Sequence, residues 1–106
     1  MSKYLIQASY TAEGAKGLLK EGGTARRAVV EKLLEGLGGH LEAFYFAFGE
    51  DDVYLIADGP DNATSAAMSL TISASGAVRT KTIVLLTPEE MDQAAKKTVK
   101  YRPPGS

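Results

Sequence analysis

Two adjacent arginines are the strongest indication of a binding site in this sequence. Arg26 and Arg27 follow Gly22-Gly23-Thr24, where the pattern predicts the beginning of a helix. Backbone N–H groups at a helix N-terminus, together with two guanidinium groups, favour an anion. The segment lacks the lysine and glycine spacing of a phosphate-binding P-loop, and a solvated helix face is the alternative interpretation. Thr24, Arg26 and Arg27 are therefore candidate ligand-binding residues.

His40 is the only histidine, and imidazole is the side chain that most readily exchanges protons near neutral pH. It follows Gly38-Gly39 at the edge of an expected strand, where a structural or solvated role is the alternative to acid–base chemistry. One histidine does not make a histidine-rich zinc or haem site, and no second ligand stands at a recognisable spacing. We expect no metal and no cofactor, and we assign no catalytic residue.

Tyrosines complete the candidate set. Tyr10 and Tyr45 lie in expected strands, where their rings are predicted to fill a core or an interface while their hydroxyl groups reach its rim. Serine nucleophiles lack support, because the serines between positions 65 and 75 lie in or near a small-residue helix without a nucleophile elbow. Further polar candidates are Tyr54 and Arg79. The predicted ligand-binding residues are Tyr10, Thr24, Arg26, Arg27, His40 and Tyr45.

Five acidic side chains gather between positions 50 and 61. Carboxylates at this density are compatible with calcium or magnesium, but their spacing does not match an EF-hand loop. Each falls where turns and helix caps need such residues. We interpret them as turn and capping residues: Glu50, Asp51, Asp52, Asp58 and Asp61.

The composition is that of one ordinary globular domain. The chain has 106 residues, of which 44% are hydrophobic and 24% charged. Twelve Lys and Arg against thirteen Asp and Glu give a net charge of −1, which argues against a duplex-binding surface. There is no cysteine, no secretory signal is visible, and no apolar stretch approaches the length of a membrane span. We expect a cytoplasmic protein without nucleic-acid or membrane partners.

Hydrophobic periodicity predicts alternating strands and helices. Strands are expected at 4–10, 40–48, 52–58 and 78–86, and helices at 25–37, 63–73 and 88–97. The glycine-rich segment 11–23 is expected to form only a weak helical turn and a loop, with Thr24 as the N-cap of the first long helix. Thr87-Pro88-Glu89-Glu90 predicts a capping box that begins the last helix. We predict one domain over residues 1–100 and a proline-rich tail over 101–106.

The order β-α-β-β-α-β plus a last helix predicts an α+β, ferredoxin-like fold with a four-stranded antiparallel sheet and two helices on one face. In the second strand, Phe44, Phe46 and Phe48 alternate with other apolar residues, which predicts two apolar faces. We expect the face without helices to be covered by the sheet of a second copy, making a homodimer or larger homo-oligomer. The alternative is that the last helix folds over this face within one chain.

The chain resembles, over nearly its whole length, small bacterial proteins with the GYD domain, a family related to the dimeric α/β barrels. The resemblance implies a ferredoxin-like fold and oligomerisation through the sheet, without a settled activity. The family is named for Gly-x-Tyr-Asp at the hairpin, and Asp51 occupies the tyrosine position here. The segments that carry the resemblance are Tyr4-Leu5-Ile6, Tyr10-Thr11 with Gly14, Arg26-Arg27, Leu37-Gly38-Gly39, Phe44-Tyr45 and residues 49–52.

Three functions are compatible with these residues. The first is a homo-oligomeric binding protein with a small pocket near the first helix for an organic acid or aromatic metabolite. The second, implied by similarity to barrel enzymes, is a cofactor-free monooxygenase or isomerase, and it requires His40 or a tyrosine in the pocket. The third is a structural assembly protein that uses only the apolar sheet face and its tail.

Overall fold

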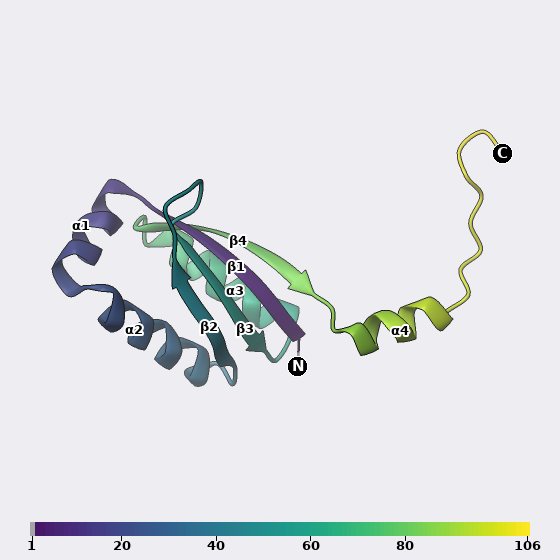
Figure 1. The fold of residues 1–106 in the computed structure, drawn as a ribbon, viewed down its shortest axis with the longest axis horizontal. Helices are drawn as coiled ribbons and strands as arrows, with labels where there is room; N and C mark the ends of the chain where they lie inside the picture. The colour runs from purple at the N-terminus through teal and green to yellow at the C-terminus, as the bar shows by residue number, and fades with distance from the viewer. Residues whose placement is uncertain (1) are drawn as a thin grey trace.

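A computed structural model of the protein describes residues 2–106 and shows an antiparallel sheet with helices packed on one side (Figure 1). The predicted α+β ferredoxin-like fold is confirmed. In chain order the elements are β1 (Ser2–Tyr10), α1 (Ala12–Glu21), α2 (Gly23–Gly36), β2 (His40–Phe46), β3 (Val53–Gly59), α3 (Asn62–Ala74), β4 (Val78–Leu85) and α4 (Pro88–Lys96).

The four strands lie in the order β2-β3-β1-β4, and each neighbouring pair is antiparallel. The core lies on the face that α2 and α3 cover, which we call the helix face. Tyr4, Ile6 and Ala8 alternate along β1 and are buried, and Leu34 of α2 and Met68 of α3 pack in the same cluster. The alternate residues of each strand form the opposite side of the sheet, which we call the open face.

α1 corrects the prediction of a weak turn and a loop, because it is a helix of ten residues. The Thr11 side chain caps it by accepting a hydrogen bond from Gly14 N, and Gly22 ends it with a φ of +82°. Glycine adopts this left-handed conformation without a Cβ clash, so α2 begins directly afterwards at Gly23. The predicted N-cap Thr24 is therefore wrong, and Thr24 lies inside the first turn of α2.

β2 differs from simple alternation. The register shifts between Leu41 and Ala43, so a β-bulge brings the buried Leu41 to the helix face together with Phe44. His40, opposite Asp58, therefore lies on the open face, whereas simple alternation along β2 would place it on the same face as Phe44. Phe48 lies beyond the end of the strand at Phe46, so only two of the three phenylalanines belong to β2 and the predicted strand 40–48 is shorter.

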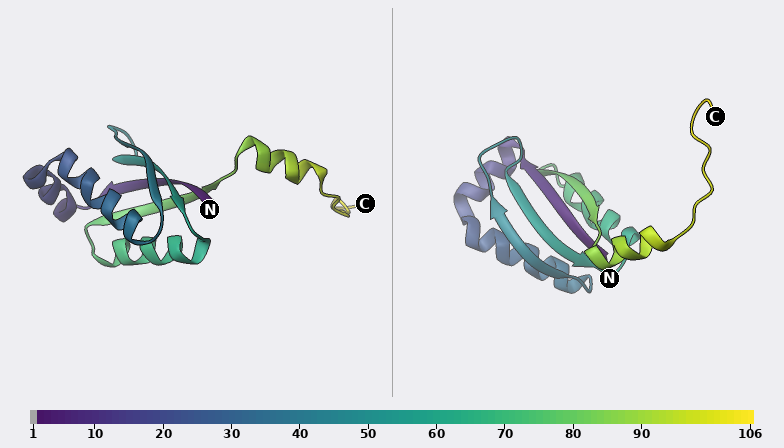
Figure 2. Two further views of the ribbon diagram at one scale, coloured as in Figure 1. Left: turned by 90° about the horizontal axis from the view of Figure 1, so that it is seen from below. Right: turned by 45° about the vertical axis from the view of Figure 1, so that its right-hand side comes forward.

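α4 does not cover the open face, so that alternative is wrong. The helix extends away from the sheet beyond the end of β4, as both rotated views also show (Figure 2). All its residues are exposed. Its predicted capping box is confirmed, since Thr87 Oγ1 accepts from Glu90 N and Glu90 Oε1 accepts from Thr87 N.

Candidate functional site

Tyr10 and Arg26 line one cavity between the sheet and α2, although sixteen positions separate them in the sequence. Tyr10 ends β1, and Arg26 lies in the first turn of α2, just after the Gly22 connection. The cavity has a volume of about 40 Å³, and its wall is otherwise almost entirely apolar. Among its lining side chains are Ile6, Val30, Phe44, Leu55 and Ile72, with Thr80 as the other polar residue.

Among the described residues, 2–106, Arg26 carries the only charge on the cavity wall. Among residues 2–106 it forms no ion pair with a carboxylate, whereas its neighbour Arg27 pairs with Glu31 at 3.9 Å. Burial raises the pKa of Tyr10, and the positive charge of Arg26 opposes that rise. The Tyr10 hydroxyl is therefore protonated at neutral pH, and it lies beside a guanidinium group that forms no ion pair among residues 2–106.

A second, wider hollow adjoins the cavity. It has a volume of about 220 Å³ and shares Tyr10, Arg26 and Val78 with the cavity, so the two spaces meet at these residues. Its outer wall belongs to α1 and contributes the carboxylates of Glu13 and Glu21. A small molecule at the junction would place one part among apolar side chains and the other part in this open, acidic hollow.

α1 is held over this hollow mainly by its first turn. Thr11 N donates to Ala77 O at 3.0 Å, and the Thr11 hydroxyl donates to Gly76 O at 2.9 Å. Gly14 packs so closely that a Cβ there would overlap the Ala77 carbonyl oxygen. No residue of α1 is buried, so these few contacts decide where the helix lies.

The other predicted ligand-binding residues lie elsewhere. Thr24 and Arg27 are exposed on α2 and line neither space. His40 is exposed on the open face, and Tyr45 is 71% exposed opposite Tyr54 on the same face. The structure thus brings together two of the six predicted residues and separates the other four from them.

A comparison of the sequence with models of known protein families finds a match, which covers nearly all of the helices and strands described above. The model of the GYD domain matches residues 4–95, which includes every strand core and all four helices except the end of α4. The chain belongs to the GYD domain family. No curated protein and no solved structure matches the chain.

The motif segment of this GYD domain folds back onto the sheet instead of forming a free turn. Asp52 Oδ2 accepts a hydrogen bond from Tyr10 N at 2.8 Å, and Asp52 N donates to Ala8 O at 2.8 Å. These hydrogen bonds attach the loop of residues 49–52 to the end of β1 that contains Tyr10. The aspartate of the motif therefore helps to position a cavity residue.

Asp51, at the motif's tyrosine position, is a feature that sequence reasoning missed. It is only 4% exposed, and its carboxylate accepts from Ser9 Oγ at 2.8 Å and lies 3.5 Å from Lys81 Nζ. Its partners Gln7, Ser9 and Lys81 all lie on the open face. The glycine and acidic residues at positions 49–52 predict a turn. That the Asp51 carboxylate is buried becomes visible only when the pairing of β1 with β4 brings its partners together.

We expect Asp51→Ala to lower the free energy of unfolding by about 1–3 kcal/mol, because Ser9 and its neighbours lose a buried acceptor. Urea unfolding followed by circular dichroism measures the change. Glu50→Ala is the matched control, since Glu50 is exposed in the same loop, and it should stay within about 0.5 kcal/mol of the wild type. Equal stabilities for the two variants would contradict a structural role of Asp51.

None of the helices formed by residues 2–106 is long and apolar enough to span a membrane. The cytoplasmic location stays a prediction.

Proposed function

We propose that this GYD domain binds a small organic monoacid in the cavity between its sheet and α2. The observation that carries the proposal is the convergence of Tyr10 and Arg26 at the junction of an apolar cavity and an open hollow. Sites for small ligands commonly combine apolar walls with a few polar groups that orient the ligand. At the junction of the two spaces those groups are the Tyr10 hydroxyl and the Arg26 guanidinium.

The chemistry of the wall defines the class of ligand. Burying a hydrocarbon or aromatic part of the ligand is favourable by about 25 cal/mol for each Å² of apolar surface removed from water, so this part prefers the apolar cavity. A carboxylate beside Arg26 gains charge-assisted hydrogen bonds in the guanidinium fork geometry. The ligand's apolar part therefore enters the cavity, and its acid group remains at the junction.

The size and charge of the two spaces narrow this class further. About 10–15 Å³ is enough for one water molecule, so a cavity of about 40 Å³ admits only a few heavy atoms and a larger group extends into the outer hollow. Glu13 and Glu21 in that hollow repel a second negative charge on a ligand. We expect short aliphatic or simple aromatic monoacids to bind better than dianions such as phosphate monoesters.

The position of His40 argues against the enzymatic alternative. A cofactor-free monooxygenase or isomerase that shuttles a proton through His40 needs that imidazole in the pocket, but His40 lies on the open face. Tyr10 alone would have to supply the acid–base chemistry, and burial raises its pKa away from neutrality. Binding without transformation is therefore the better-supported function.

We also propose that the protein acts as a homodimer assembled through the open face. Leu5 lies between Ile56 and Ile83 in the sheet register, so these three side chains form one continuous apolar strip. Ile83 on β4 is 45% exposed, and Tyr45, on the same face at the opposite edge strand β2, is 71% exposed. A second sheet of the same kind would cover this strip. Phe46 is not part of this strip, because it lies on the helix face near Gly23.

We expect Ile83→Asp to shift the protein to the monomer, because it places a charge in the apolar strip. Val84→Asp is the matched control: Val84 is similarly exposed, at 52% against 45%, but lies on the other face of β4. Sedimentation velocity measures both. A dimer that survives Ile83→Asp, or one that both variants disrupt equally, would contradict an interface on the open face.

Native mass spectrometry of protein purified without denaturation tests the two proposals together. A dimer with a reproducible extra mass that disappears after denaturation supports ligand binding and identifies the compound to be tested. A bare dimer that also fails to bind added butyrate, hexanoate or benzoate would support the purely structural assembly function instead. A bare 11.2 kDa monomer would contradict the dimer.

A further inference from the structure

Residues 87–106, which we call the arm, leave the body of the domain at the end of β4. The radius of gyration is 17.0 Å, whereas a compact chain of this length has about 13 Å. The longest dimension is 57 Å, and the arm extends along it, away from the sheet (Figure 1). Every residue of the arm after Thr87 is exposed.

The helical part of the arm, α4, carries several features that stabilise a helix. A helix of nine residues is marginal in water on its own, since isolated helices shorter than about 12–15 residues rarely persist. α4 has a complete capping box, Pro88 in its first turn and acidic residues where the helix dipole favours them. Apolar side chains of α4 and of the segment after it are not covered by any part of residues 2–106: Met91 is 54% exposed, Val99 79% and Tyr101 73%. These features are typical of a segment that packs on another surface.

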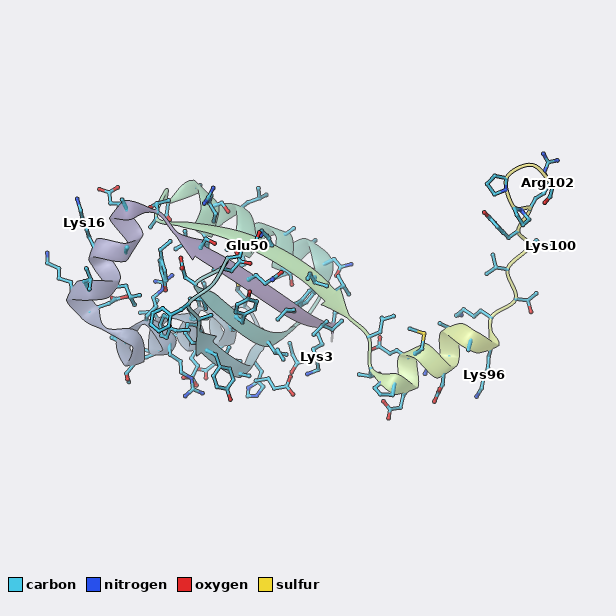
Figure 3. The ribbon with its side chains drawn as sticks, turned by 45° about the horizontal axis from the view of Figure 1, so that its top comes forward. Lys3, Lys16, Glu50, Lys96, Lys100 and Arg102 are labelled. Carbon is cyan, nitrogen blue, oxygen red and sulfur yellow. The ribbon has the colours of Figure 1, made fainter. Side chains whose placement is uncertain are left out.

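Charge is divided unevenly between the arm and the body. The body, residues 1–86, contains eight Lys and Arg against ten Asp and Glu. Within the arm, residues 96–106 contain four Lys and Arg and no Asp or Glu, and the three acidic residues of the arm all lie in α4. Figure 3 shows Lys96, Lys100 and Arg102 far from the body that carries this acidic excess. The basic end of the arm therefore complements the body of the same chain but does not reach it.

We propose that the arm binds the acidic body of a second copy of this chain and strengthens the homodimer. Met91, Val99 and Tyr101 supply apolar contact, and Lys96, Lys97, Lys100 and Arg102 supply charge complementarity. A polyanion such as nucleic acid is the less favoured partner, because the adjoining body, with its net charge of −2, repels it. This inference rests on the proposed homodimer and not on ligand binding.

The test compares two double variants of the full chain that change the net charge equally. Lys100→Glu with Arg102→Glu alters the arm, and Lys16→Glu with Lys20→Glu alters exposed lysines of α1. Sedimentation equilibrium gives the dimer dissociation constant in dilute buffer and in about 0.5 M salt, where the Debye length falls to a few ångströms. We expect at least tenfold weaker dimerisation for the arm variant in dilute buffer, no more than twofold for the α1 variant, and the difference to shrink in salt.

Equal dissociation constants for the two variants would overturn the inference. So would tight binding of the wild-type arm to a short single-stranded DNA or to vesicles with anionic lipid while the dimer stays unaffected, since the partner would then be a polyanion. A wild-type protein that is monomeric at every concentration would overturn both the arm contact and the sheet dimer. Butyrate binding by such a monomer would leave the proposed ligand site standing.

Discussion

Arg26→Ala is expected to weaken the binding of a monoacid such as butyrate or benzoate by about tenfold to 100-fold. The variant removes the only charge on the cavity wall, and hydrogen bonds to charged groups contribute about 1.5–3 kcal/mol each. Isothermal titration calorimetry on the folded variant measures the loss. Benzamide, the neutral analogue of benzoate, should bind both proteins weakly and with similar affinity, since the contribution of Arg26 requires the negative charge.

Arg27→Ala is the matched control for this prediction. Arg27 is the next residue of α2, but its side chain does not line the cavity and pairs with Glu31. It should leave the affinity for monoacids within about twofold of the wild type, since exposed pairs contribute little. Equal losses for the two variants would indicate a general attraction of acids to α2 and would contradict a defined site at Arg26.

Gly14→Ala is expected to lower the free energy of unfolding by about 1–3 kcal/mol and to displace α1 from the outer hollow. A Cβ at this position overlaps the Ala77 carbonyl oxygen, and the ring of Tyr10 stands on the same side at 3.1 Å. Because the clash is with backbone, a change of side-chain rotamer cannot relieve it, so α1 or the start of β4 has to move. Urea unfolding measures the loss of stability.

For Gly17→Ala, about one helical turn later in α1, we expect the opposite change in the free energy of unfolding. Nothing lies within 4 Å of a Cβ placed there, so alanine should raise the free energy of unfolding by up to about 1 kcal/mol through its higher helix propensity. The two substitutions add the same methyl group to the same helix and differ only in what it meets. Destabilisation by both, or by neither, would contradict the close packing of Gly14 against Ala77.

The strands, the two long helices and the capping box could be predicted because they depend on local patterns. Apolar residues at helical spacing in α2, alternation in β1 and β3, and Thr87-Pro88-Glu89-Glu90 each report their own conformation. The end of α2 follows a local rule as well, since Gly38 just after it has a φ of +80°, which glycine adopts readily.

Two errors arose where tertiary contacts override a local pattern. The glycines of α1 lower its helix propensity, but Gly14 is needed for close packing on Ala77, and the Thr11 cap stabilises the first turn. In β2 the bulge beside Glu42 accommodates one extra residue opposite β3 and so reverses the face of His40 relative to Phe44. A bulge has no reliable sequence signal when both faces of a strand are apolar.

The candidate site was predictable only in part. Tyr10 and Arg26 were both selected for their chemistry, but their meeting depends on Gly22, which lets α2 turn back after α1. Thr80 was missed, because an ordinary strand threonine becomes a wall residue only through the pairing of β1 with β4. Residues 16 positions apart can be chosen from a sequence, but the cavity between them is a property of the sheet register and the helix connections.

The most direct test of ligand binding at Tyr10 and Arg26 is an NMR titration of the arginine side-chain N–H resonances with butyrate or benzoate. We expect the Arg26 resonance to shift and saturate while those of Arg27 and Arg79 stay in place, since Arg27 pairs on the outer side of α2 and Arg79 lies on the open face. Uniform, non-saturating shifts of all the arginines, or a saturating shift confined to Arg79, would contradict the proposed site.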